Sequence, residues 1–203
     1  MEECSFHGFN CDFTKIITVP DKKDLFFQEA QFDEEQVEDL RFQILSIPNI
    51  SLGVLLPDAE LFHSSSSSQS WWTSSVPKSQ SAGGVFFSTI PQLSIWGGKA
   101  PLGVTLKYQT KKNSFPILHV PSRSLLLPIL IELSDEEELK EPRAERNLVG
   151  DDIIPLLNQL GFWGYYSCEE CEIYLSNEAI PKILESKPSV WEDRRISSSY
   201  RIR

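Results

Sequence analysis

Four cysteines and one histidine form the clearest pattern of metal-ligand residue types in the sequence. Cys4, His7 and Cys11 lie close together near the N-terminus, and Cys168 and Cys171 form a Cys-x-x-Cys pair near the C-terminus. Thiolate and imidazole groups are the ligands that structural zinc prefers, and four of them complete its tetrahedral shell. The sequence therefore predicts a zinc site that joins the two ends of the fold, either with four cysteines or with His7 replacing one of them.

The Cys-x-x-Cys pair also has simpler interpretations. On a continuous strand Cys168 and Cys171 point to opposite faces, so both can bind one ion only if the chain turns between them. Cys171 shares its parity with Ile173 and Leu175, which is typical of a small side chain buried in a sheet. Redox chemistry is disfavoured, because the neighbouring glutamates oppose formation of a thiolate. The metal interpretation therefore depends on whether the two cysteine groups meet in space.

No common catalytic motif is present in the sequence. It contains no glycine-rich phosphate loop and no Gly-x-Ser-x-Gly nucleophile elbow. None of the three histidines forms a His-x-x-x-His pair, and His119 lies in the apolar run ILHV, which favours a half-buried sheet position over a catalytic base. Because carboxylates are abundant, an enzyme with an unrecognised carboxylate site stays an alternative. We predict a non-enzymatic protein.

Charge is unevenly distributed along the chain. The net charge is −10, yet the middle third is basic between two acidic flanks. An acidic protein repels nucleic acid at long range and attracts a basic partner. The middle segment nevertheless interleaves basic residues with Trp96 and Tyr108, and such a sheet face can stack single-stranded bases. This nucleic-acid alternative, with or without zinc, assigns the contacts to Lys99, Lys107, Lys111, Lys112 and Arg123.

Two segments suit contact with a protein partner. Trp71 and Trp72 stand in a serine-rich stretch, where they either anchor that stretch to the body or form an exposed binding patch. The segment QFDEEQVEDLRFQILSIP has the periodicity of a helix, with acidic residues in its first turn, where the helix dipole favours them. We predict that a partner with a basic surface contacts the tryptophans or five acidic residues of this helix: Asp33, Glu34, Glu35, Glu38 and Asp39.

Short apolar runs ended by proline or glycine dominate the middle of the chain. In LGVTLKY, apolar and polar residues alternate as they do in a half-buried strand. Near the C-terminus, the apparent helices GDDIIPLLNQLGF and NEAIPKILES flank the apparent hairpin WGYYSCEECEIYLS. We predict an α+β fold: a central, mostly antiparallel sheet at roughly residues 85–133, an N-terminal helix and a C-terminal helix–hairpin–helix unit.

The chain of 203 residues fits one domain. Residues 63–84 are predicted to be a mobile serine-rich loop, because they cannot bury enough apolar surface to offset the entropy of ordering. Residues 134–147 are predicted to be an acidic linker before a subdomain at 148–190. The longest apolar run is far shorter than a bilayer span, and no signal-peptide pattern is present. We expect a cytoplasmic or nuclear accessory or regulatory protein, of eukaryotic or viral type, that is not secreted and does not bind membranes.

Overall fold

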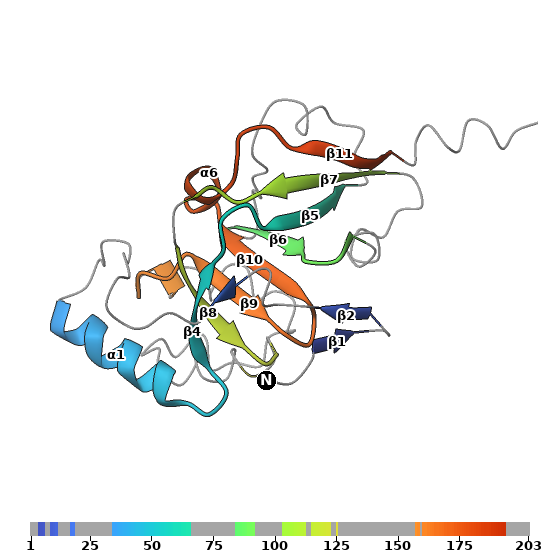
Figure 1. Cartoon of the computed structure of the whole chain (residues 1–203). Coiled ribbons are helices and arrows are strands. Elements are labelled where there is room, and N and C mark those ends of the chain that lie inside the picture. The colour runs from blue at the N-terminus through green and yellow to red at the C-terminus, as the bar shows by residue number, and fades with distance from the viewer. Residues whose placement is uncertain are drawn as a thin grey trace, which may run out of the picture.

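The fold is seen in a computed structural model. It describes residues 4–6, 9–11, 17–18, 34–65, 84–91, 103–112, 115–122, 125, 157–158 and 160–193, and within these ranges the description of side chains begins at Glu38. β-Strands make up most of this structure, as Figure 1 shows. The strands are β1 (Cys4–Phe6), β2 (Phe9–Cys11), β3 (Ile17–Thr18), β4 (Ser51–Leu55), β5 (Glu60–Ser65), β6 (Gly84–Ser88), β7 (Val104–Gln109), β8 (Pro116–Val120), β9 (Gly164–Ser167), β10 (Glu172–Ser176) and β11 (Ser189–Asp193). The helices are α1 (Glu34–Ser46) and α6 (Ile180–Ile183).

Within the described ranges, the strands form one large sheet and one small sheet. The large sheet has nine strands in the order β11-β7-β5-β6-β10-β9-β8-β4-β3, and β1 pairs with β2 alone. The predicted α+β fold with a mostly antiparallel sheet at 85–133 is wrong, since strands from residue 17 to residue 193 contribute to a mixed sheet. β8 and β9 pair in parallel. A parallel pair needs a crossover, here residues 121–163, and local alternation does not show which distant strands will pair.

The predicted C-terminal helix–hairpin–helix unit is also wrong. β9 and β10 do form a hairpin, but β10 also pairs with β6 and β9 with β8, so the hairpin is the centre of the large sheet. α6 is a single turn, because the chain becomes extended at Leu184, which bridges to Thr110. The segment NEAIPKILES therefore contributes one helical turn and then continues toward β11.

Each face of the large sheet carries its own apolar cluster. Along β10, Ile173 and Leu175 belong to one cluster and Tyr174 to the other, as the alternation of side chains along a strand requires. α6 adds Ile180 to the first cluster, and α1 adds Ile44 to the second. The central strands are consequently buried on both faces, which is why β9 and β10 have almost no polar positions facing solvent.

The predicted subdivisions of the chain are not tested by this structure. β5 continues to Ser65 and β6 begins at Gly84, and residues 66–83 between them lie outside the described ranges. The predicted acidic linker at 134–147 lies outside them as well. The assignments of a loop, a linker and a C-terminal subdomain stay predictions.

Candidate interaction surface

The inner face of α1 holds this helix firmly on the large sheet. Ile44 is completely buried, and Leu40 and Leu45 are half-buried against the same cluster. The Arg41 side chain is half-buried too, and its Nε donates a hydrogen bond of 2.6 Å to the carbonyl oxygen of Leu160. A charge-assisted bond to a backbone carbonyl fixes the rotation of the helix as well as its position. α1 therefore presents a constant set of residues outward.

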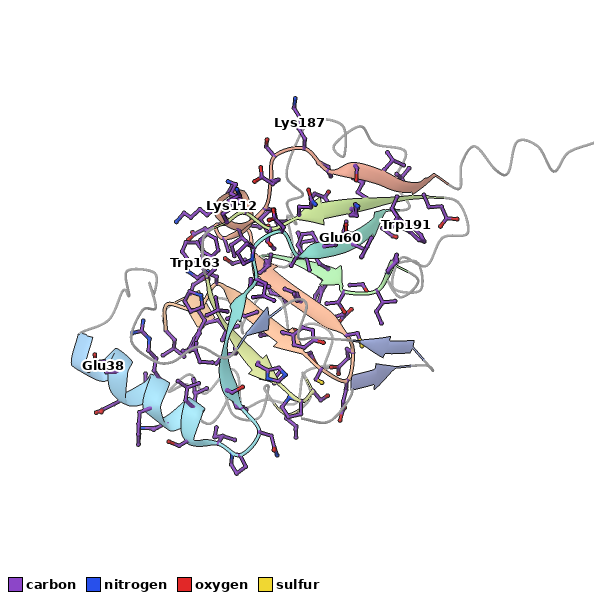
Figure 2. The ribbon with its side chains drawn as sticks, in the orientation of Figure 1. Glu38, Glu60, Lys112, Trp163, Lys187 and Trp191 are labelled. Carbon is purple, nitrogen blue, oxygen red and sulfur yellow. The ribbon has the colours of Figure 1, made fainter. Side chains whose placement is uncertain are left out.

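The outer face of α1 combines carboxylates with one large aromatic side chain. Glu38 and Asp39 are exposed, and the Phe42 side chain is 72% exposed. Residues four apart on a helix are neighbours, so Glu38 and Phe42 form one line of side chains with Ser46. Figure 2 shows Glu38 on α1, at the opposite end of the molecule from Trp191. We call Glu38, Asp39, Phe42 and Ser46 the α1 outer face.

Phe42 was missed by sequence reasoning, although the sequence contains the signal. Leu40 and Ile44 define the buried stripe, and a residue two positions from each of them lies on the opposite side of a helix. Most large apolar side chains are buried, so an aromatic residue aimed away from the core is informative. The prediction considered only the acidic residues of this segment, and it therefore described half of the surface.

The C-terminal end of α1 is well ordered by local hydrogen bonds. Ser46 Oγ donates to the Phe42 carbonyl oxygen at 2.6 Å. The Ile47 amide donates to the Ile44 carbonyl oxygen at 3.2 Å, which satisfies one of the carbonyls that a helix end leaves without a partner in the helix. Asn49 then adopts a left-handed conformation with φ of 68° in the turn that follows the helix, and the Ile50 amide donates to the Ile47 carbonyl oxygen at 3.1 Å, so that the chain turns into β4. The outer face thus continues to the last turn of the helix.

The structure places only part of the predicted partner contacts. Glu38 and Asp39 are exposed as an interaction surface requires. Glu34 and Glu35 belong to the same helix, but their side chains are not described. The remaining predicted contacts, Asp33, Trp71 and Trp72, lie outside the described residues.

Among the described residues, the lysines of the nucleic-acid alternative are not gathered on an aromatic platform. Lys107 forms an ion pair with Glu60 at 2.7 Å, and Lys111 Nζ donates to the Pro181 carbonyl oxygen at 2.6 Å. Tyr108 is 1% exposed, so its ring is part of the core and cannot stack a base. Lys112 is exposed near α6 (Figure 2). The other two predicted cations, Lys99 and Arg123, lie outside the described residues, as does Trp96.

Strand β11 forms the outermost strand of the large sheet at one edge. It exposes Val190 and Trp191, while the Trp191 ring packs edge-on against Phe62 with 6.0 Å between centroids. The pairing of β11 with β7 shifts register between Val190 and Glu192. A bulge and a nearby carboxylate are devices that discourage a further strand from pairing with an edge. The β11 edge is therefore protected against pairing with a further strand.

His63 and His119 are sheet residues whose environments favour the neutral ring. The His63 ring packs against Phe87, and its Nδ1 donates to the Phe86 carbonyl oxygen at 2.9 Å. The His119 ring stacks on Tyr166 and lies 3.1 Å from Ser51 Oγ through Nδ1, which confirms the predicted half-buried position. Burial lowers the pKa of both histidines below the ordinary value of 6.5.

We predict that the free energy of unfolding decreases as the pH falls below about 6.5, in part because of these two rings. Each histidine binds a proton more readily in the unfolded chain, so acid favours unfolding between the ordinary pKa and the lowered one. The variant His63→Asn should show a smaller loss of stability between pH 7.5 and pH 5 than the original chain in urea unfolding. Equal losses in both proteins would show that His63 does not contribute.

The predicted metal ligands are only partly described. Cys171 is completely buried in the same cluster as Ile173 and Leu175, as its parity predicts. Cys168 is half-buried and disulfide-bonded. Among the described side chains, no group of three or more His, Cys, Asp or Glu residues could hold a metal ion. Cys4 and Cys11 belong to strands that are described without their side chains, and His7 lies outside the described residues.

Comparison with known proteins finds no matching family model, no matching curated protein and no matching solved structure. Over the part of the chain that the structure describes, no helix has the length and apolar character needed to cross a bilayer.

Proposed function

We propose that this protein is a non-enzymatic interaction protein that binds a basic surface of another protein through the α1 outer face. The observation that carries the proposal is Phe42, 72% exposed beside Glu38 and Asp39 on a helix whose inner face is anchored. Such a surface has the two parts that specific binding needs. The aromatic ring supplies apolar area to be buried in a pocket, and the carboxylates supply attraction to cations around it.

The proposal extends to the setting in which the protein acts. We place it in the cytoplasm or nucleus, as an accessory or regulatory protein whose activity is binding and needs no cofactor. The serine-rich stretch with Trp71 and Trp72 is a second candidate contact for the same partner, and the two contacts can be separated by mutation. Zinc, in this proposal, has a structural role only.

We predict that Phe42→Ala weakens binding to the partner about thirtyfold or more, because removing a central aromatic anchor typically costs about 2 kcal/mol. The partner is first identified by cross-linking from the native cell, and its affinity for purified variants is then measured by calorimetry. The double variant Glu38→Gln with Asp39→Asn should weaken binding less and should reduce its dependence on salt, since rim charges act mainly through long-range attraction.

Two controls make this experiment decisive. Val190→Ala removes an apolar side chain that is also exposed, 61%, but lies at the β11 edge, so it should leave affinity unchanged. Phe42→Ala should keep the thermal stability of the original chain, which shows that any loss of binding is local. If Phe42→Ala binds normally while a Trp71→Ala, Trp72→Ala double variant does not, the contact lies in the serine-rich stretch and the α1 proposal is wrong.

The nucleic-acid alternative has a separate test with the same purified protein. Labelled single-stranded RNA should show no salt-sensitive binding if the α1 proposal is right, because two of the three described lysines of that alternative already contact Glu60 and Pro181. Binding that weakens steeply with salt and is reduced by Lys112→Gln would instead favour the nucleic-acid function.

A further inference from the structure

The chain turns between Cys168 and Cys171, which brings both residues to the same apolar cluster. The Cys171 amide donates to the Cys168 carbonyl oxygen at 3.2 Å, closing a turn at residues 168–171. Cys171 belongs to the cluster on the α6 side of the sheet, and Cys168 packs against that cluster. The thiol of Cys171 also points back along the turn, since its Sγ lies 3.6 Å from the Cys168 carbonyl oxygen. The objection that the two cysteines must face opposite sides of a strand is therefore removed.

The structure also gives the bonding state of Cys168 and Cys171. Cys168 is disulfide-bonded. Cys171 is a thiol, because its Sγ donates a hydrogen bond. The other two cysteines of the chain are Cys4 and Cys11. The backbones of Cys4 and Cys11 are direct partners across the β1–β2 hairpin.

We propose that the four cysteines, Cys4, Cys11, Cys168 and Cys171, form one zinc site in the reduced protein. Two ligands come from a strand pair and two from a tight turn, and a set of four sulfurs is the number that structural zinc takes. The site fastens the small β1–β2 sheet to the turn between β9 and β10. It goes beyond the α1 surface and does not depend on it.

The turn that carries Cys168 and Cys171 is held in place from several sides. The amides of Cys168 and Glu169 donate to the carbonyl oxygens of Val120 and Pro121 at 3.0 and 2.8 Å. Glu170 accepts hydrogen bonds from the hydroxyl groups of Ser122, at 2.9 Å, and Ser167. Cys171 has a φ of 50°, which is uncommon for a residue other than glycine. Ligands whose positions are fixed before the metal arrives bind it with a smaller loss of entropy.

Formation of the zinc site from the oxidised protein needs only a small thiol as the reductant and one Zn²⁺ ion. Two molecules of a small thiol of the glutathione class reduce the Cys168 disulfide to two protein thiols, and the two molecules are oxidised to one disulfide. The four cysteine thiols then release four protons as they bind one Zn²⁺ ion, which leaves a centre of net charge −2. The reducing conditions expected inside a cell favour the thiols and hence the metal-bound form.

The test is to measure metal content and thiol number on the full chain. Protein is reduced, incubated with excess zinc, desalted without reductant and analysed for metal; we expect one zinc ion per chain. Replacing zinc with Co²⁺ should give the intense thiolate-to-cobalt absorption and the visible bands of a tetrahedral sulfur site. A thiol reagent should modify the native zinc form slowly and all four cysteines quickly after a chelator is added.

Single substitutions test which side chains bind the zinc ion. Cys4→Ser and Cys168→Ser should each reduce zinc retention at least tenfold in a chelator competition, and they avoid the fully buried Cys171, whose replacement could prevent folding. His7→Ala should retain the full amount of zinc; loss in this variant would overturn the four-cysteine set. Folded, reduced protein that takes up no stoichiometric zinc would overturn the proposal, as would full retention by Cys168→Ser.

Discussion

Replacing Gly164 with alanine is expected to prevent the chain from reaching its folded state. Gly164 begins β9 and pairs with Leu175 of β10. A methyl group at this position would overlap the carbonyl oxygen of Tyr174 and would press on the backbone of Leu175. Backbone atoms of a central strand cannot move aside, so β9 and β10 would have to separate. We expect a loss of more than about 4 kcal/mol, a large share of the stability of a small protein.

The measurement for Gly164→Ala is the recovery of soluble protein, followed by circular dichroism and urea unfolding. Gly84→Ala provides a second case, since a methyl group there would meet Leu175 and the Tyr174 ring on the other side of β10. Ser189→Ala, at an exposed position of the edge strand β11, is the control and should change stability by less than about 0.5 kcal/mol. A Gly164→Ala variant as stable as the control would show that β9 and β10 do not approach this closely.

The two glycines also show what local sequence can and cannot predict. The β9–β10 hairpin is visible in the sequence because its two strands are adjacent and joined by a short turn. The close approach of β6 and β9 to opposite sides of β10 depends on pairings between distant segments, which leave no local pattern. For the same reason the parallel pairing of β8 with β9 was not predicted, and the sheet was assigned to too short a region.

The candidate sites also divide into features with a local sequence pattern and features that depend on contacts between distant segments. The helix α1 was predicted because apolar residues of one helix face recur at a fixed spacing, and the structure packs Leu40 and Ile44 of that face on the sheet. The exposure of Phe42 could have been predicted from that spacing, since it follows from where the stripe lies. The cysteines are different: sequence could pose the question of whether Cys168 and Cys171 share a side, but only the turn at 168–171 answers it. A turn within an otherwise strand-like run depends on which carbonyls, here those of Val120 and Pro121, accept its amides.

The second large effect is expected from Phe87→Ala. Phe87 is completely buried in the middle of β6, with its ring edge-on to Tyr108 at 5.4 Å and tilted against His63 at 5.8 Å. Removing a buried phenylalanine ring typically costs about 3–5 kcal/mol, because transfer energy is lost and a cavity is left behind. Urea unfolding should show a lower midpoint with an unchanged slope, which is the sign of a loss of stability without a change of fold.

Phe42→Ala is the matched control for Phe87→Ala, since the same atoms are removed from a side chain that is 72% exposed. It should change the free energy of unfolding by less than about 0.5 kcal/mol, which also makes it a clean variant for the binding experiment.

Phe87 also affects the pKa of His63, because its ring helps to exclude water from the His63 side chain. A cavity that admits water should bring the pKa of His63 back toward its ordinary value, so the Phe87→Ala variant should lose less stability on acidification than the original chain. Equal acid sensitivity together with a large loss of stability would confine the role of Phe87 to packing and would assign the lowered pKa of His63 to its other neighbours.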